Sequence, residues 1–399
     1  MNPPKNSLAS QRTIVFITAE YPFGQQETFV ENEIIYLSDA FDQIVVLPKS
    51  TPGMPRTMPP NCSLGSPYGG VSASVGNNLL WKEWFRIKGH VGKSKVACRS
   101  WQSINKRLTQ IKASTKDIKG EITYYSYWLD EGAMAAAYLS QREGRIAISR
   151  AHGWDVYPFR HPHKYLPFRQ FLAKSELTVC PISNHGLNAL RSQGFNKLAL
   201  FYLGTHAPTT TTVSQTQQNQ GSKKLVSVSS IIALKRVKRI AQIFVQLRKS
   251  DSQWQWHHFG DGPLEGELRH WLETQGVDNY HLHGRQPNET VRDWLNKNHD
   301  YSLFINQSTT EGLPVSMMEA MSYSIPCVGT NVGGVSEIID NGNNGLLHGD
   351  DLDPNAVARS IEALSTERLI SMGKNAKKSW ENHFNAGKNY KAFMKALMA

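Results

Sequence analysis

The chain has 399 residues, of which 40% are hydrophobic and 19% are charged. This length predicts two or three domains, and the composition excludes collagen, a small disulfide-stapled protein and a fully disordered chain. No apolar run approaches the ~18 residues of a membrane-spanning helix, and no secretory signal precedes the first predicted strand, so we expect a cytoplasmic protein. The cysteines form no C-x-x-C pair, which argues against a disulfide framework or a thiolate zinc site: Cys62, Cys98, Cys180 and Cys327.

The net charge of +11 predicts an anionic partner, and it is unevenly distributed. Between Lys82 and Lys119 there are eleven Lys and Arg residues against two acidic residues, which leaves nine excess positive charges in this stretch. Apolar residues recur there at helical spacing and predict an amphipathic helix over Leu79–Val91, at Leu80, Trp84, Ile87 and Val91. This helix could lie on an anionic bilayer, with residues 79–119 as the contact surface. The alternative is a helix that packs on its own domain and exposes a basic edge.

Short apolar runs alternate with longer helical stretches along most of the chain. This alternation predicts parallel sheets with crossover helices, with strands near residues 14–17, 44–47, 121–125, 145–149, 177–181, 225–229, 254–259, 280–283, 301–305 and 325–328. A polar stretch over residues 208–222 has no apolar periodicity and is predicted to be a linker or exposed loop. The pattern therefore favours two doubly wound α/β domains in tandem.

The segment Thr310–Glu319 follows a predicted strand and carries two glutamates eight residues apart. Pro314 suits the first turn of a helix. The free amides at that helix start would bind a phosphate: Gly312, Leu313 and Val315. Glu319, further along the helix, can accept two hydrogen bonds from a vicinal diol such as a ribose, and Glu311 can bind hydroxyls of a second group. The alternative is a capped helix with two unrelated glutamates.

This segment resembles the E-x7-E signature of retaining glycosyltransferases of the GT-B fold, family 4. Further segments resemble the C-terminal domain of that family in the expected order: its opening strand, loop and helix (225–237), the F-G-D-G-P turn (259–263), the H-G-R loop near the nucleotide base (283–285), the G-G-x-x-E helix start (333–337) and the N-G-L-L hairpin (344–347). The resemblance implies two Rossmann-like domains that face each other across a cleft.

The N-terminal half matches the family more loosely. Tyr21–Gly24 and Glu27–Phe29 resemble the first loop and helix of polysaccharide-assembly members, and Ala151–Asp155 resembles the H-G-x-D segment at the cleft. The implied domains are an acceptor-side domain (1–207), the linker or loop (208–222), a nucleotide-sugar-binding domain (223–380) and a C-terminal helix (381–399) that would pack back on the N-terminal domain.

The resemblance also implies the residues of the site. His152, Glu311 and Lys235 are expected to be catalytic. The expected donor-binding residues are Gly24, Ser230, Lys235, Gly284, Arg285, Glu311, Gly312, Leu313, Pro314, Val315 and Glu319. Many family members carry Arg at the position of Ser230, where it clamps the donor diphosphate together with a lysine. Here Lys235 would supply a point charge, and Arg236 or Arg239 could compensate for the missing Arg.

The implied function is transfer of a sugar, with retention, from a nucleotide sugar to a lipid-linked or growing oligosaccharide of a bacterial surface polysaccharide such as O-antigen, capsule or exopolysaccharide. The enzyme would be a hexosyltransferase that works at the inner face of the cell membrane, with no metal and no further cofactor. The alternatives are a GT-B epimerase or phosphorylase, or a basic nucleic-acid-binding protein. We expect no nucleic acid as partner, because the sequence has no nucleic-acid-recognition motif.

Overall fold

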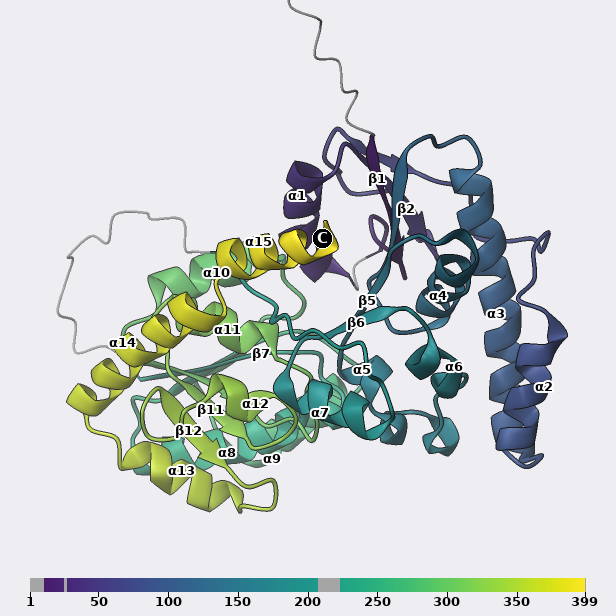
Figure 1. Ribbon diagram of the computed structural model, residues 1–399. Helices are drawn as coiled ribbons and strands as arrows, with labels where there is room; N and C mark the ends of the chain where they lie inside the picture. The colour runs from purple at the N-terminus through teal and green to yellow at the C-terminus, as the bar shows by residue number, and fades with distance from the viewer. Residues whose placement is uncertain (1–10, 25–26, 207–222, 399) are drawn as a thin grey trace, which may run out of the picture. The chain divides into compact units, whose positions relative to one another are not determined.

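The computed structural model describes residues 11–24, 27–206 and 223–398 (Figure 1). The chain forms two compact units. The N-terminal domain contains the residues up to Phe201 together with those from Tyr390 onward, and the C-terminal domain contains Tyr202–Asn389. Each domain is described by itself below.

The observed domain limits differ from the predicted limits at residues 207 and 380. The segments on either side of the C-terminal domain are hydrogen-bonded to each other, because the Thr205 amide donates to the Phe384 carbonyl oxygen (2.9 Å) and the Asn389 side chain donates to the Leu203 carbonyl oxygen (2.8 Å). Both segments therefore belong to the C-terminal domain. The predicted linker at 208–222 lies outside the described residues.

Within the described residues, the N-terminal domain has a six-stranded parallel sheet in the order β3-β2-β1-β4-β5-β6. Alternate residues of the central strand face opposite sides, so that Ile14 and Phe16 join one apolar core and Val15 and Ile17 join the other. The strands are β1 (Arg12–Thr18), β2 (Gln43–Pro48), β3 (Cys62–Leu64), β4 (Glu121–Ser126), β5 (Ala147–Ala151) and β6 (Thr178–Pro181).

Helices cover both faces of this sheet, as expected for parallel strands. The long α3 and α4 lie on one face, and α1 with the end of α15 lies on the other. The helices are α1 (Glu31–Ala40), α2 (Asn77–Arg86), α3 (Val91–Thr115), α4 (Glu131–Glu143), α5 (Gly153–Val156), α6 (Arg169–Lys174), α7 (Asn184–Ser192) and α15 (Ala386–Leu397), with short 3-10 helices at Thr28–Val30, Pro158–Arg160 and Pro162–Lys164.

The amphipathic helix predicted over Leu79–Val91 is wrong in extent, and its apolar face packs on its own domain, which was the alternative to a membrane-facing orientation. Helix α2 ends at Arg86, and a turn in which Lys88 and Gly89 have positive φ separates it from α3, which begins at Val91. The predicted apolar face packs inward, where Ile87 forms a small core with Ala97 and Tyr165. Trp81 and Phe85 point outward instead and are 53% and 80% exposed.

The C-terminal domain has, in the described residues, a second six-stranded parallel sheet in the order β12-β11-β10-β7-β8-β9. The segment 344–347, predicted as part of a hairpin, instead leads into strand β12, which begins at Gly345 and pairs in parallel with β11. Strand β11 comes before this strand in the chain and a helix lies between the two, so the connection is a crossover. The strands are β7 (Lys224–Val228), β8 (Gln255–Phe259), β9 (Tyr280–Leu282), β10 (Ser302–Asn306), β11 (Cys327–Thr330) and β12 (Gly345–His348).

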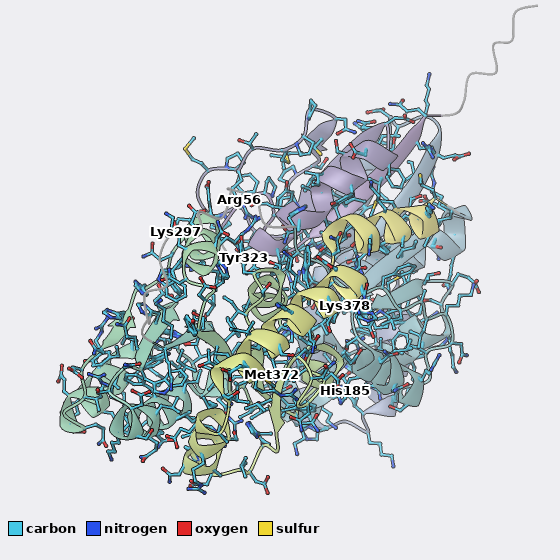
Figure 2. The ribbon with its side chains drawn as sticks, turned by 90° about the vertical axis from the view of Figure 1, so that its left-hand side faces the viewer. Arg56, His185, Lys297, Tyr323, Met372 and Lys378 are labelled. Carbon is cyan, nitrogen blue, oxygen red and sulfur yellow. The ribbon has the colours of Figure 1, made fainter. Side chains whose placement is uncertain are left out.

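Helices also flank this second sheet. Helix α14 turns Met372 toward the domain interior and exposes Lys378 on its other side (Figure 2). No helix among the described residues is long and apolar enough to span a membrane. The helices are α8 (Val237–Ser250), α9 (Glu265–Thr274), α10 (Asn288–Lys297), α11 (Val315–Ser322), α12 (Val335–Ile338), α13 (Pro354–Glu362) and α14 (Thr366–His383), with a 3-10 helix, η4, at Ala233–Lys235.

Candidate active site

The strand order of the C-terminal domain reverses between β7 and β10, and ligands of open α/β sheets bind at the carboxyl ends of such strands. The loops that follow these two strands are joined by hydrogen bonds. The Thr309 amide donates to the Leu234 carbonyl oxygen (2.9 Å), and the Arg236 guanidinium donates to the carbonyl oxygens of Gln307 (2.5 Å) and Ser308 (3.2 Å). Most of the predicted site residues lie on these two loops and on α11.

Glu311 is buried and has one carboxylate oxygen surrounded by donors. Its Oε1 accepts hydrogen bonds from Lys235 Nζ (2.6 Å), Ser308 Oγ (2.6 Å) and Asn306 Nδ2 (3.0 Å). Burial by itself raises the pKa of Glu311, but the Lys235 charge and the three hydrogen bonds outweigh it and lower the pKa. Glu311 is therefore a held, ionised carboxylate whose Oε2 has no partner among the described residues.

Glu319 lies on α11, eight residues after Glu311, and is also buried. Its Oε1 accepts a hydrogen bond from Asn288 Nδ2 (2.8 Å), and within residues 223–398 its Oε2 has no hydrogen-bond partner. Burial raises the pKa of Glu319, although Asn288 and the charge of Arg292 oppose this effect. The two glutamates thus share one arrangement, in which the protein holds one oxygen and leaves the other for a ligand.

The structure brings Lys235 to Glu311 but gives the neighbouring arginines other partners. Lys235 ends η4, and α8 begins only at Val237. Arg236 forms an ion pair with Asp350 (2.6 Å), and Arg239 donates to the Gln307 side chain (3.0 Å). Both guanidinium groups therefore tie loops of the domain together, which argues against their replacing the missing Arg. Ser230 is exposed on the loop after β7.

The start of α11 provides unpaired backbone donors. Pro314 occupies the N-cap position, one residue before the helix rather than in its first turn. In the described part of the chain, the amides of Gly312, Leu313 and Val315 make no hydrogen bond. Gly333 (φ +55°) packs against the backbone of Glu311, where a Cβ would lie 2.0 Å from the Glu311 carbonyl oxygen. This close contact holds the G-G-x-x-E segment against the α11 start, which can accept an anion.

The F-G-D-G-P turn and the H-G-R loop lie side by side. The Gly260 amide donates to the Gly284 carbonyl oxygen (2.8 Å), and the ring of His283 stacks on Phe259 at 4.3 Å between centroids. Gly284 has a φ of +64°, a conformation that glycine adopts without strain. Arg285 follows it and is exposed.

His152 and Gly24 lie in the N-terminal domain, in loops at the carboxyl end of its sheet. His152 follows β5, and its buried ring stacks on Tyr127 (4.9 Å between centroids) and contacts Trp128 (4.6 Å). The Nδ1 atom of His152 lies 3.8 Å from Asp155 Oδ2, and Nε2 has no hydrogen-bond partner among the described residues. Gly24, with a φ of +60°, donates from its amide to the Pro52 carbonyl oxygen (3.1 Å).

Glu27 is an organising residue to which sequence reasoning assigned no role. Its buried carboxylate accepts hydrogen bonds from the amides of Ala19 (3.1 Å), Glu20 (2.6 Å) and Tyr21 (2.7 Å) and from Trp128 Nε1 (2.5 Å). It thereby joins the loops after β1 and β4, the point where the strand order of the N-terminal sheet reverses. The available signal was the resemblance of the segment Glu27–Phe29 to the first loop and helix of polysaccharide-assembly members, but the partners of Glu27 are set by the tertiary fold.

Within the described ranges, no group of three or more His, Cys, Asp or Glu side chains is arranged to hold a metal ion. The polar groups of the C-terminal site are instead hydrogen-bond donors, two carboxylate oxygens and one ammonium. Such a set suits a ligand with hydroxyls and an anionic group.

Known proteins resemble this chain in sequence and fold. The family described as glycosyl transferases group 1 matches residues 209–379. The crystal structure of HepE from Anabaena, solved in complex with UDP, superposes with a TM-score of 0.69 at 14% identity, over 97% of this chain and 99% of that one. The chain has the GT-B fold, and its C-terminal half matches the family of glycosyl transferases group 1. The predicted fold class is thereby confirmed.

Two curated relatives of this chain are named for polysaccharide biosynthesis. The putative colanic acid biosynthesis glycosyltransferase WcaL of Escherichia coli K12 is 27% identical over 254 residues, which is 61% of this chain and 61% of WcaL. The putative teichuronic acid biosynthesis glycosyltransferase TuaC of Bacillus subtilis 168 is 23% identical over 313 residues, or 73% of this chain and 75% of TuaC. The match to WcaL thus spans less than two thirds of that protein.

Proposed function

We propose that this GT-B protein transfers a sugar, with retention of anomeric configuration, from a nucleotide sugar to a saccharide acceptor in the synthesis of a bacterial surface polysaccharide. The observation that carries the proposal is the pair of buried glutamates, each with one oxygen held and one free, on either side of an unpaired helix start. The names of WcaL and TuaC support the polysaccharide as product.

In this proposal the nucleoside diphosphate binds along α11. Glu319 accepts the two ribose hydroxyls, and the amides of Gly312, Leu313 and Val315 bind the diphosphate. The free oxygen of Glu311 accepts a hydroxyl of the transferred sugar. Lys235, held against Glu311, supplies positive charge to the leaving group. His152, whose Nδ1 faces Asp155, provides its Nε2 atom for the donor sugar or the acceptor.

The transfer step needs no protein base. The bond between the anomeric carbon and the diphosphate oxygen breaks, and the acceptor oxygen forms a new bond to that carbon on the same face. The acceptor proton goes to the leaving diphosphate, so the charge and atoms balance. The protein then contributes positioning and stabilisation of the negative charge.

The acceptor is proposed to be lipid-linked, with the N-terminal domain resting on the cytoplasmic face of an anionic membrane. Exposed aromatic residues of α2 beside exposed lysines support this part, namely Trp81 and Phe85 beside Lys82 on the helix and Lys88 in the turn after it. Not every basic residue between 82 and 119 contributes charge to this proposed membrane-contact surface. Arg107 is buried and donates to the Leu47 carbonyl oxygen (2.9 Å), and Arg86 is paired with Glu83 (2.5 Å).

Calorimetry with UDP, GDP, ADP and CMP tests the donor site. We expect one of these nucleotides to bind, and its sugar conjugates to be hydrolysed slowly or transferred when saccharides are added. Binding of none of the four would contradict the proposed donor site.

A further inference from the structure

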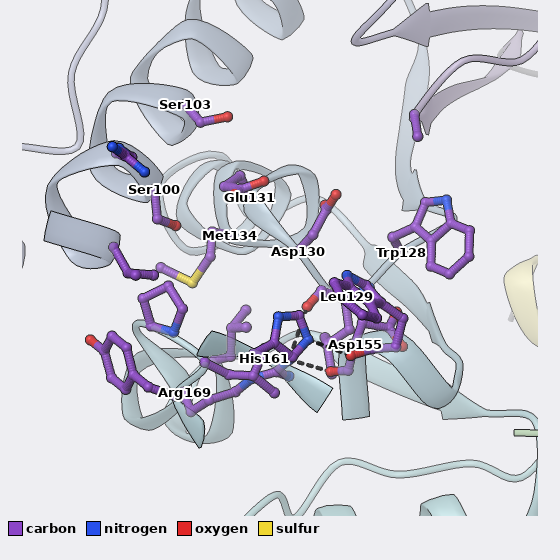
Figure 3. Close-up of a pocket in the computed structure, with 18 of the residues that line it drawn as sticks. Ser100, Ser103, Trp128, Leu129, Asp130, Glu131, Met134, Asp155, His161 and Arg169 are labelled. Carbon is purple, nitrogen blue, oxygen red and sulfur yellow. Dashed lines mark hydrogen bonds between the residues drawn. The ribbon is translucent and has the colours of Figure 1, made fainter. Parts of the chain in front are cut away.

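Three buried carboxylates of the N-terminal domain have both oxygens held by donors of the protein. Asp155, in the wall of a cavity of about 750 Å³ (Figure 3), accepts hydrogen bonds from the amides of His152 (2.5 Å) and Leu129 (2.7 Å). Glu27 and Glu33 likewise have a donor at each oxygen. Burying a carboxylate without such partners is costly. The protein alone therefore fixes the direction of these three groups.

Glu319 of the C-terminal domain is also buried but has a single partner. The Nδ2 atom of Asn288 donates to its Oε1 (2.8 Å), and its Oε2 has no hydrogen-bond partner in residues 223–398. This one neutral donor does not offset the burial, so the pKa of Glu319 is raised. The direction of the Glu319 carboxylate therefore depends on Asn288 alone.

The side chain of Asn288 reaches away from its own helix. Asn288 is the first residue of α10, and asparagine at a helix start often binds the free amides of that helix. Here the N-cap residue is Pro287, no side chain caps α10, and the Asn288 amide extends to α11 instead. The contact therefore joins two helices that are separate in the sequence.

The loop that leads into α10 is fixed at its other end to the F-G-D-G-P turn. The Gly260 amide donates to the Gly284 carbonyl oxygen (2.8 Å). Pro287 then restricts the backbone, at a φ of −55°, directly before Asn288. The H-G-R loop is thus held between the turn after β8 and the carboxylate of Glu319. Asn288 sets the position of that carboxylate relative to this loop.

Helix α10 also places a positive charge near Glu319. Arg292 lies four residues after Asn288, on the same side of the helix, and its charge favours the ionised form of Glu319. Helix α11 and the strands beside it, β10 and β11, contain no other charged residue, and the buried residues of α14, which packs on α11, are uncharged. Both contributions of α10 therefore support a carboxylate that accepts hydrogen bonds.

We propose that Asn288 is a positioning residue of the donor site, which holds one oxygen of Glu319 so that the other accepts from the ribose, and which thereby makes the site select ribonucleotides. The inference rests on the proposed function, in which Glu319 binds the ribose hydroxyls. An acceptor that is ionised and fixed before the ligand arrives loses less conformational freedom on binding.

Calorimetry on the full chain tests this role. The ligands are the nucleotide that binds among UDP, GDP, ADP and CMP, and its dideoxy analogue, which lacks both ribose hydroxyls. Asn288→Ala removes the donor, and Asn288→Asp replaces it with a second carboxyl group; Asn288 is exposed, so neither change disturbs a core. Asn355→Asp, at an exposed position in the first turn of α13, is the matched control. Each protein is titrated at pH 5.5 and at pH 8.

We expect wild type and Asn355→Asp to bind the ribonucleotide about tenfold more tightly than the analogue. In Asn288→Ala this preference disappears at pH 5.5, because the buried Glu319 takes up a proton when it loses its donor, and it returns in part at pH 8. Affinity for the analogue should be the same in all four proteins at a given pH, which shows that the variants are folded.

Asn288→Asp should show the opposite pH trend. At pH 5.5 the two carboxyl groups share a proton, and the protonated one donates to the other as the amide did. At pH 8 that proton is released and the two charges repel each other, so the preference for the ribonucleotide is lost as the pH rises. A residue that only supported the fold would not produce opposite trends in the two variants.

Equal loss of both ligands in Asn288→Ala, an unchanged preference in that variant, or the same pH trend in both Asn288 variants would overturn the inference and leave the proposed function intact. Binding of none of the four nucleotides to the wild type would contradict the proposed function and this inference together. The wild-type titration therefore distinguishes the two failures.

Discussion

At the scale of single residues, Glu311 and Glu319 differ in how the protein holds them. Glu311 is bound by an ammonium and two further donors, which keep it ionised and fixed in direction. Glu319 has one amide partner and a raised pKa, so the protein compensates its burial less well. A buried carboxylate with few hydrogen-bond partners is stabilised more by a ligand that donates hydrogen bonds to it than one whose partners the protein already supplies.

Substitution of the two glutamates should separate nucleotide binding from turnover. Glu319→Gln removes the charged acceptor for the ribose hydroxyls, which costs roughly 1.5–3 kcal/mol, or about ten- to a hundredfold in nucleoside diphosphate affinity. Glu311→Gln should leave that affinity nearly unchanged and reduce turnover sharply, because its contact is with the reacting sugar. Calorimetry and transfer rates measure the two effects.

Glu381→Gln, an exposed charge on α14, is the matched control and should change neither quantity. Loss of nucleotide binding in Glu311→Gln together with its retention in Glu319→Gln would mean that the donor binds in the opposite direction.

At the scale of elements, strand β8 contains two histidines that the fold keeps neutral. His258 is fully buried, and burial lowers its pKa to about 4. The unfolded chain therefore binds a proton near pH 6.5 that the folded chain binds only near pH 4, so stability decreases as the pH falls through this range. From pH 7 to pH 5 this group alone should cost about 2 kcal/mol of unfolding free energy.

His258→Asn tests this pH dependence. Asparagine retains an acceptor for Ser227, whose hydroxyl lies 2.8 Å from His258 Nδ1, but it does not titrate. Urea unfolding at pH 7 and pH 5 should show a loss about 2 kcal/mol smaller in the variant than in wild type. The exposed His270→Asn should behave as wild type. Equal losses in all three proteins would show that His258 is protonated in the folded state.

The α2–α3 hairpin provides the second prediction at this scale. Simultaneous substitution of the exposed Lys82, Lys88 and Lys95 by Gln should weaken binding to phosphatidylglycerol vesicles about a hundredfold, since each charge near an anionic surface contributes about 1 kcal/mol. The matched control replaces three exposed lysines of α14, Lys374, Lys377 and Lys378. Cosedimentation measures binding. Equal loss in both triple variants would indicate an effect of net charge alone.

At the scale of the whole molecule, the last ten residues belong to the domain formed by the first half of the chain. Phe393 is fully buried there. Its ring lies 3.8 Å from the guanidinium carbon of Arg150 and 5.2 Å from the ring of Phe201, measured to centroids. Arg150 is itself paired with Glu33 (3.3 Å) in the core. The end of α15 is therefore part of the N-terminal core.

Phe393→Ala should destabilise the N-terminal domain by about 3–5 kcal/mol, the usual cost of truncating a buried aromatic side chain. Urea unfolding followed by tryptophan fluorescence should show the loss in one transition. Lys391→Ala, exposed on the same helix, should change stability by less than about 0.5 kcal/mol. Equal stability of the two variants would exclude a core role for this helix.

The sequence by itself determined the fold class and most strands, because apolar periodicity and the parallel crossover pattern are local signals. It also determined which loop carries the glutamates, through the residues from Thr310 to Glu319. It did not determine whether the apolar face of α2 meets its own domain or a membrane, because Leu80, Trp84 and Ile87 suit either surface and only the tertiary structure places them in a core.

The tertiary structure decided which residues the charged side chains of the two domains contact. Lys235 and Glu311 are 76 residues apart, and Glu27 and Trp128 are 101 residues apart, so their contacts depend on the order of strands within each sheet. The same holds for Arg236 and Arg239, whose charges suggested phosphate binding and whose hydrogen bonds instead tie loops together. The sequence shows which groups a charged side chain is able to bind. Only the packing of the folded chain decides whether that side chain binds another part of the protein or remains available to a ligand.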